Sequence, residues 1–414
     1  MPWKETCAVE ERMRFVMDVL RGEYSKARLC RQYGISRPTG DKWMIRYLEQ
    51  SVAGLLDQSR VPHSSPQQVR LELVECIVAL RRKHSHWGPR KLRVLLQQRL
   101  SEVRWPACST IGEILRRAGL TVPRTRRRHT PPWTQPFAHC DGPNAVWCAD
   151  FKGWFRTGDQ QRCDPLTISD AYSRYLLKLQ GLRQTGYPDV QALFATTFRR
   201  YGLPRAIRTD NGTPFASHGV GGLSRLSVWW IKLGIVPERI EPGCPQQNGR
   251  HERMHLTLQQ ETATPPASSL TAQQRRFDSF QEEFNHQRPH EALGQKCPGE
   301  VYQSSPRSYP ESLAKVEYPA EMEVRGVKGN GVFNWRGEVV FLGEALSHER
   351  VGLMEIADGC WGVYFCRHPL GVLDQRRRKV MDASQAVRKG IVSDELLRSP
   401  FRYAPGAPEQ NANV

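Results

Sequence analysis

Three acidic residues stand where a carboxylate needs a specific reason. Asp150 lies inside the apolar segment AVWCADFKGWF, Asp210 ends the segment AIRTD before an Asn-Gly turn, and Glu252 follows a loop marked by Gly and Pro. An acid in the apolar middle of a strand is unfavourable unless it is paired or binds a metal. Carboxylate oxygens suit Mg²⁺ or Mn²⁺ rather than zinc. Each Asp alone indicates only a turn or cap, but together the three predict catalytic metal ligands for phosphodiester displacement with two ions.

The segments around these acids predict an α/β sandwich over residues 145–300. Short apolar runs bounded by turn residues predict strands, and longer amphipathic runs predict helices. Strands are expected at 146–155, 165–169, 175–179, 206–209 and 235–240, and helices at 188–201, at 224–233 and from 249 onward. This order favours one mixed sheet covered by helices, which would bring the three acids together.

Residues 1–50 predict a helix-turn-helix DNA-binding domain. Ser25 and Ser36 are suitable N-caps and Gly34 supplies the tight turn between them. The third helix should bury Trp43 and Leu48. Its exposed side would enter a major groove with these residues: Arg37, Thr39, Lys42 and Arg46. A plain three-helix bundle is the alternative interpretation.

The segments that flank the predicted sheet divide into four parts. Residues 51–66 read as a linker, and residues 65–122 predict a second helical, winged-helix-like DNA-binding unit. Residues 123–144 form a basic linker whose Arg126, Arg127 and Arg128 would contact DNA phosphates. Short strands at 316–385 predict a small β-barrel that contacts DNA or another protomer, or that serves folding stability alone. Its candidate DNA-contacting residues are Arg325, Lys328, Arg336 and the run 376–379.

The charge of the chain indicates a polyanionic partner. The 414 residues include 60 Lys and Arg against 42 Asp and Glu, which gives a net charge of +18. Residues 1–128 hold 26 of these basic residues and only 12 acidic ones. Such a concentration of positive charge favours nucleic acid, bound mainly by the N-terminal third.

The remaining composition predicts an intracellular protein. The 11 cysteines show no CxxC pair and no spaced Cys/His quartet, so we expect free thiols in a reducing compartment and no structural zinc. No apolar run suggests a signal peptide or a membrane span. We therefore expect a soluble, cytoplasmic, nucleoid-associated protein.

Several motifs resemble the integrase core shared by retroviral integrases and DDE transposases of bacterial insertion sequences. They span residues 145–294 and occur in the order that this family requires. The matching segments are WCADFKG (147–153), TISDAYSRY (167–175), RTDNGTPF (208–215), PGCPQQNGRHERMH (242–255) and FNHQRPHEALG (284–294). The resemblance implies an RNase H-like fold, with Asp150, Asp210 and Glu252 as the catalytic metal ligands.

One departure from the family pattern concerns the spacing of the acids. Between Asp210 and Glu252 lie 41 residues, more than is typical of the family. We assign the excess to the Gly-rich stretch SHGVGGLSR (217–225), a loop insertion that need not move either carboxylate. The role of this insertion is left open by the sequence.

Residues near the acids have predicted secondary roles. Asn248, Arg250 and His255 are expected to contact DNA, whereas Asp170 is better explained as a turn former than as a further metal ligand. The segment that contains Asn285 and Arg288 is most simply a structural latch between the last helices.

These features predict a transposase that binds the terminal inverted repeats of its element, cleaves DNA strands and joins them to target DNA. Because the two ends of an element must be joined to one target, we expect a homo-oligomer, at least a dimer on paired ends. A retroviral-type integrase would instead begin with a zinc-binding His/Cys unit. The alternatives are a structure-selective RNase H-like nuclease and a catalytically inactive DNA-binding regulator.

Overall fold

The first of two units, Met1–Arg70, is a helical domain. The computed structural model describes residues 7–59, 68–121, 140–217, 219–240, 249–377 and 379–398. The elements of this unit are α1 (Ala8–Arg21), α2 (Lys26–Gln32), α3 (Arg37–Gln50) and the 3₁₀ turn η1 (Ser51–Leu55). Gly34 has φ +64°, as the turn before α3 requires. The Thr39 amide donates to Ser36 Oγ at 3.3 Å, so Ser36 caps α3 as predicted.

The core of this domain corrects two expectations. Trp43 is buried, but Leu48 is 70 % exposed. The buried face of α3 continues from Trp43 to Tyr47 one turn later, and Leu48 lies about 100° further around the helix. Residues 51–55 belong to the domain rather than to a linker, because Leu55 is fully buried and its carbonyl accepts a hydrogen bond from Arg12 at 2.7 Å.

The second unit, Leu71–Val414, begins with three helices. They are α4 (Leu71–Lys83), α5 (Pro89–Arg99) and α6 (Cys108–Arg117). Their own apolar core contains Ile77, Leu80, Trp87, Leu92, Leu95, Leu96, Trp105, Ile111 and Leu115. Residues 68–121 contain no strand, so the described part of this segment is helical but shows no wing.

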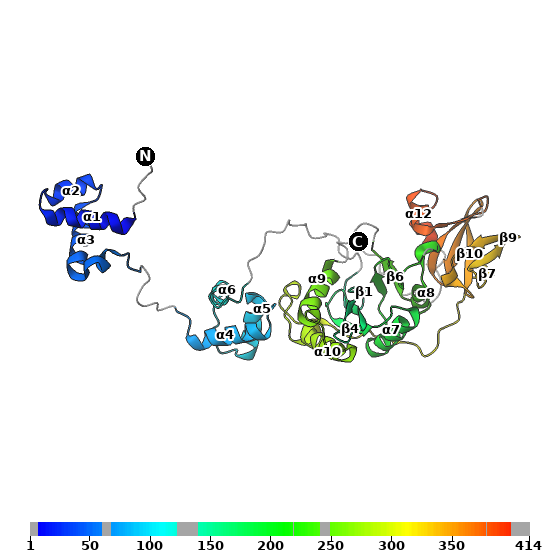
Figure 1. The fold of residues 1–414 in the computed structure, drawn as a ribbon. Coiled ribbons are helices and arrows are strands. Elements are labelled where there is room, and N and C mark those ends of the chain that lie inside the picture. Colours follow the sequence, from blue (N-terminus) through cyan, green and yellow to red (C-terminus); the bar gives the residue numbers. More distant parts are fainter. Residues whose placement is uncertain are drawn as a thin grey trace. The chain divides into compact units, whose positions relative to one another are not determined.

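A six-stranded mixed sheet forms the centre of the second unit (Figure 1). The order is β4-β3-β1-β5-β6, with β2 paired to β3; β1, β5 and β6 are parallel, whereas β3 is antiparallel to β1, β2 and β4. The predicted first strand is broken after Phe151, where Gly153 has φ +93°. The strands are β1 (Val146–Phe151), β2 (Phe155–Arg156), β3 (Arg162–Asp170), β4 (Leu176–Leu182), β5 (Ala206–Thr209) and β6 (Val236–Arg239).

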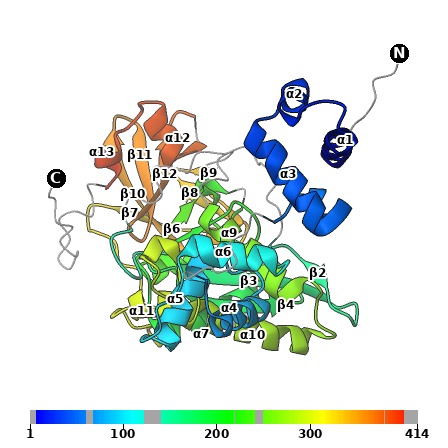
Figure 2. The ribbon, with the colours of Figure 1, turned by 90° about the vertical axis from the view of Figure 1, so that its left-hand side faces the viewer.

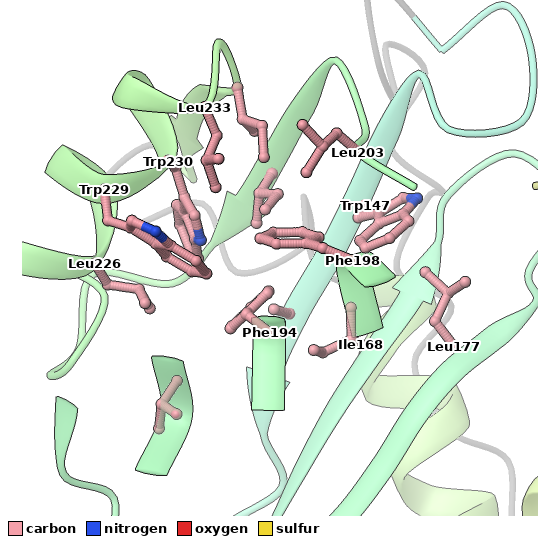
Figure 3. Close-up of a cluster of buried hydrophobic side chains, with 14 of the residues drawn as sticks. Trp147, Ile168, Leu177, Phe194, Phe198, Leu203, Leu226, Trp229, Trp230 and Leu233 are labelled. Carbon is pink, nitrogen blue, oxygen red and sulfur yellow. The ribbon is translucent and has the colours of Figure 1, made fainter. Parts of the chain in front are cut away.

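Helices cover both faces of this sheet, as Figure 1 shows. On one face, α7 (Tyr187–Tyr201) and α8 (Arg225–Lys232) pack on the aromatic cluster of Figure 3, in which Trp147 and Phe198 lie beside Trp229 and Trp230. On the other face, α9 (Gly249–Leu258) and α10 (Leu270–His286) pack on β3 and β4 through Met254, Leu258 and Phe277. The short helix α11 (Pro298–Val301) follows.

The C-terminal part forms an antiparallel sheet and a separate hairpin. The sheet has the order β13-β12-β11-β10-β7, and among the described strands β8 pairs only with β9. Although β8 contacts β7 and β9 contacts β13, the described strands pair as two sheets rather than as one closed barrel. The strands are β7 (Glu323–Gly326), β8 (Val332–Trp335), β9 (Glu338–Phe341), β10 (Arg350–Ala357), β11 (Cys360–Phe365), β12 (His368–Asp374) and β13 (Lys379–Asp382). Figure 2 shows α12 (Ala383–Arg388) and α13 (Asp394–Arg398) beside this sheet.

The Gly-rich insertion 217–225 attaches this C-terminal sheet to the central one. The Val220 amide donates to Leu342 O at 2.8 Å, and Leu223 enters the apolar core of the C-terminal strands. Lys232 on α8 adds an ion pair with Glu349 at 2.8 Å. The residues that lengthen the interval between Asp210 and Glu252 therefore form a contact between two parts of the chain. Among the described residues, no helix has the length and apolar character needed to cross a bilayer.

Candidate active site

Two of the three predicted catalytic acids lie at the ends of neighbouring strands. In the parallel pair β1 and β5, Ala149 is the partner of Thr209, and each is followed directly by an acid, Asp150 and Asp210. Side chains alternate between the faces of a sheet. Trp147 and Ala149 face α7 and α8, so Asp150 faces the side covered by α9. Both carboxylates are partly exposed at this edge.

Asp210 is fixed by the turn that follows it. The Gly212 amide donates to Asp210 Oδ1 at 3.2 Å, and the Asn211 side-chain amide donates to Ile240 O at 3.1 Å. A Cβ atom at Gly212 would lie 3.0 Å from Asp210 Oδ2. The Asn-Gly sequence therefore lets the chain turn tightly around the carboxylate.

Glu252 projects from α9 with an exposed side chain. The helix is anchored to β3 on both sides of Glu252 in sequence, because His251 Nε2 and His255 Nε2 lie 2.6 Å and 2.8 Å from Thr167 Oγ1. Thr167 is in turn the antiparallel partner of Asp150 and donates to its carbonyl oxygen at 3.0 Å. Neither Thr167 nor the role of His251 was predicted from the sequence.

His255 is placed differently from our expectation of a phosphate contact. Its Nε2 atom is occupied by Thr167. Burial, with a smaller effect of Lys152, lowers the pKa of His255 to about 4. The ring is therefore neutral near pH 7 and poorly suited to bind a phosphate, so the structure favours an internal role.

The carboxylate oxygens of the predicted ligands are chemically suited to a hard divalent cation. Asp150 and Asp210 present carboxylate oxygens at one edge of the sheet, the kind of ligand that Mg²⁺ and Mn²⁺ prefer. Within the part of the chain that the structure describes, however, no three His, Cys, Asp or Glu side chains converge closely enough to hold a metal ion. The predicted ligands are thus brought to one region but not gathered into a metal-binding group.

The predicted DNA-reading residues lie on α3. Arg37 and Lys42 are exposed, while Thr39 is half-buried with its hydroxyl 2.8 Å from Ser36 Oγ. Arg46 donates to Gln58 Oε1 at 2.8 Å and lies over the Trp43 ring. Arg37 and Lys42 are therefore the most accessible of the set.

Other predicted contacts lie outside the described residues. Arg126, Arg127, Arg128 and Asn248 belong to this group, and for Arg250 only the backbone within α9 is described.

Two structural interpretations are consistent with the geometry. Asp170 is fully buried and accepts hydrogen bonds from the Asn144 amide and from both the amide and hydroxyl of Ser173, as expected of a turn former. Asn285 holds both backbone groups of Leu176, with hydrogen bonds of 2.8 Å and 3.0 Å. Arg288 pairs with Glu261 at 2.7 Å, so the segment does connect the last helices of the core.

Family models match most parts of the chain. Integrase core domain models match residues 141–245 and 233–298, and the C-terminal domain of the IS481 family transposase matches residues 322–381. A helix-turn-helix domain matches residues 11–63 and a homeodomain-like domain matches residues 39–115.

Relatives of similar sequence come from insertion elements. A 31.7 kDa protein of insertion element IS407 from Burkholderia multivorans is 26% identical over 67% of this chain and 90% of its own length. A 39.2 kDa protein of insertion element IS476 from Xanthomonas euvesicatoria is 27% identical over 67% of this chain and 72% of its own. Among solved structures, the HTLV-2 integrase catalytic core in complex with magnesium matches with 13% identity and a TM-score of 0.29, over 39% of this chain and 99% of its own.

Residues 141–298 are therefore similar to integrase core domains, and residues 11–115 are similar to helix-turn-helix and homeodomain-like domains. The C-terminal match adds a similarity to the IS481 family of transposases over residues 322–381. This confirms the resemblance to insertion-sequence transposases that the sequence motifs indicated.

Proposed function

We propose that this protein is a transposase that binds the terminal inverted repeats of its element and catalyses metal-dependent strand cleavage and strand transfer with Asp150, Asp210 and Glu252. The observation that carries the proposal is the register of β1 and β5, which sets two carboxylates on adjacent parallel strands. The hydrogen bonds from α9 to Thr167 support Glu252 as the third, because they hold its helix against the strand paired with β1.

In this proposal Asp150 and Asp210 would hold two Mg²⁺ or Mn²⁺ ions from the sheet edge, and Glu252 would complete the set from α9. The ions would supply the positive charge that stabilises the entering and leaving oxygens of the phosphodiester. Water and a 3′-hydroxyl are equivalent nucleophiles for such a site, so one set of carboxylates serves both cleavage and joining.

DNA recognition is assigned to α3 and to basic segments near the core. Arg37, Thr39 and Lys42 would read bases, while Arg46 would contact the backbone. Arg126 to Arg128 of the basic linker, together with Asn248 and Arg250, would contact DNA phosphates. His255 is left out of this set because its ring is neutral and bonded to Thr167.

The test is a cleavage assay on DNA that carries the ends of the element, with Mg²⁺ present and absent. The proposal predicts nicks at the element ends that require the metal, followed by joined products when target DNA is added. Cleavage of branched DNA regardless of sequence would instead support the structure-selective nuclease. Specific binding without any cleavage in Mg²⁺ or Mn²⁺ would support the inactive regulator.

A further inference from the structure

Helix α9 has an unusual stripe of residues on the side that faces the sheet. The residues that face the sheet are His251, Met254, His255 and Leu258, which follow the i, i+3, i+4, i+7 spacing of a core-facing helix side. Met254 and Leu258 pack among apolar residues such as Phe277, as expected. The other two positions of the stripe, one turn apart on either side of Glu252 in sequence, are imidazoles, although apolar side chains would fill them without a cost of polar burial.

Both imidazoles meet one hydroxyl group. Thr167 is fully buried, and its Oγ1 lies 2.6 Å from His251 Nε2, 2.8 Å from His255 Nε2 and 3.0 Å from Asp150 O. A threonine hydroxyl has one hydrogen to donate and two lone pairs that accept. Because the Asp150 carbonyl can only accept, Thr167 donates to it, and both histidines must donate their Nε2–H to Thr167. All three contacts are then satisfied with both rings neutral.

The geometry also orients the two rings. They meet edge to face, with centroids 4.8 Å apart and an interplanar angle of 88°. His251 Nδ1 lies 3.5 Å from Ser169 Oγ, where it can accept from the hydroxyl, in agreement with a proton on Nε2. A hydrogen-bonded cluster of this kind admits one position of a helix on a sheet, whereas apolar packing tolerates small shifts.

We propose that Thr167, His251 and His255 form a latch that sets the position of Glu252 relative to Asp150. They are positioning residues for the reaction, and this inference rests on the proposed function. The latch connects the strand paired with the first acid to the helix of the third acid through a single hydroxyl group. Rate depends steeply on such placement, since a displacement of about 1 Å in a catalytic group can cost about 100-fold.

The test replaces Thr167 by Val and by Ser. Val keeps the shape of Thr but removes the hydroxyl, so kcat for cleavage of element-end DNA should fall by about 10- to 100-fold while KM stays within about twofold. Ser restores the hydroxyl and should recover most of kcat. Thr197→Val is the matched control. Thr197 is also buried, but it lies on α7 at the opposite face, and within the described part of the chain its hydroxyl bonds only to Leu193 O.

A second readout does not depend on activity. Hydrogen exchange of the α9 amides should speed up in Thr167→Val and in His251→Leu, but not in Thr167→Ser or Thr197→Val. Two results would overturn the latch. One is an unchanged kcat together with unchanged α9 exchange in Thr167→Val. The other is an equal loss of kcat in the Val and Ser variants when both are as stable as wild type. If the wild-type protein cleaves no DNA, the proposed function fails, and the exchange comparison alone then decides whether the latch exists.

Discussion

At the residue scale, burial lowers the pKa of several basic side chains, and nearby cations add to this effect. His290 is the clearest case away from the acids. Burial is the largest cause that lowers its pKa to about 3, and Lys91, Arg288 and Arg174 contribute further. Its ring packs edge-on against Phe284 with centroids 4.8 Å apart. A proton added there would meet the positive charge of these three side chains.

This burial predicts a loss of stability in acid. In the unfolded chain His290 takes up a proton near its ordinary pKa of about 6.5, whereas the folded protein resists protonation until about pH 3. The unfolded state therefore binds more protons below pH 6.5, and stability falls as the pH drops toward 3. At pH 5 the loss from this residue should be about 1–2 kcal/mol relative to pH 7.

Urea unfolding at pH 7 and pH 5 measures this loss when wild type is compared with His290→Gln. The variant should lose less stability between the two pH values than wild type does. His86, in the turn between α4 and α5, is exposed, and His86→Gln is the control that should leave the pH dependence unchanged. An identical pH dependence of His290→Gln and wild type would show that His290 titrates normally in the folded protein.

A second prediction at this scale separates base reading from backbone contact on α3. Arg37 is exposed, so Arg37→Ala should reduce the preference for element ends over random DNA. Arg46, which bonds to Gln58, is assigned to the DNA backbone rather than to a base. Arg46→Ala should therefore weaken binding to all sequences alike. Competition binding at fixed salt measures both effects. Unchanged specificity in Arg37→Ala would remove this residue from the reading surface.

At the element scale, the Gly-rich insertion acts as a docking segment for the C-terminal sheet. Gly222 has φ +57°, and a Cβ atom there would lie 2.0 Å from an Arg239 guanidinium nitrogen. Arg239 also donates to Gly221 O, so the loop closes around the end of β6. This contact gives the six-stranded sheet a fixed junction with the C-terminal strands.

We predict that Gly222→Ala destabilises this junction more than the backbone strain alone explains. Gly359→Ala is the matched control, because Gly359 has φ +69° but open space around its Cβ position. Both substitutions should cost about 1 kcal/mol for the left-handed backbone, and Gly222→Ala should cost about 1–3 kcal/mol more through the displaced Arg239. Equal losses in urea unfolding would contradict the docking role.

Local sequence patterns predicted most of these elements correctly. The strands around Asp150 and Asp210 and the helices at 188–201 and 224–233 follow from apolar periodicity, which depends on neighbours in sequence. The prediction that Leu48 is buried was wrong, because a leucine late in a helix can lie on either side of the buried face. The antiparallel C-terminal strands were expected, but whether they close depends on contacts between distant strands, and here they pair as two sheets.

The candidate site could be predicted only in part, for a similar reason. The acids were visible because a charged residue in an apolar segment is conspicuous in the sequence alone. The sequence also shows a core-facing helical spacing at His251, Met254, His255 and Leu258. This spacing would have predicted an internal role for His255 instead of a DNA contact. Thr167 could not be identified, because its partners lie 84 and 88 residues away and only the fold brings them together.

At the scale of the whole molecule, positive charge is concentrated before the integrase core. Residues 1–128 hold 26 basic and 12 acidic residues, so we expect DNA binding and the proposed chemistry to reside in different parts of the chain. A protein organised in this way can bind one DNA end and act on another. We therefore keep the proposal of an oligomer, at least a dimer, on paired ends.

Complementation between two defective variants tests action in trans. Asp150→Asn protein should bind DNA without cleaving it, and an Arg37→Ala, Arg46→Ala double variant should retain the acids but bind element ends weakly. Mixed in equal amounts, the two should recover part of the wild-type cleavage of paired ends. No recovery, together with only monomers on paired ends in sedimentation, would contradict assembly in trans.

The central claim is that Asp150, Asp210 and Glu252 act as one metal-dependent site. The most direct measurement is the cleavage rate of element-end DNA by Asp150→Asn, Asp210→Asn, Glu252→Gln and their pairwise combinations, with DNA affinity measured in parallel. Glu282→Gln, an exposed acid on α10, is the control. Each single change should reduce the rate by about 1,000-fold or more, with pairs no worse than singles and affinity nearly unchanged. A variant of one of these three acids that keeps more than about a tenth of wild-type cleavage would contradict the claim for that residue.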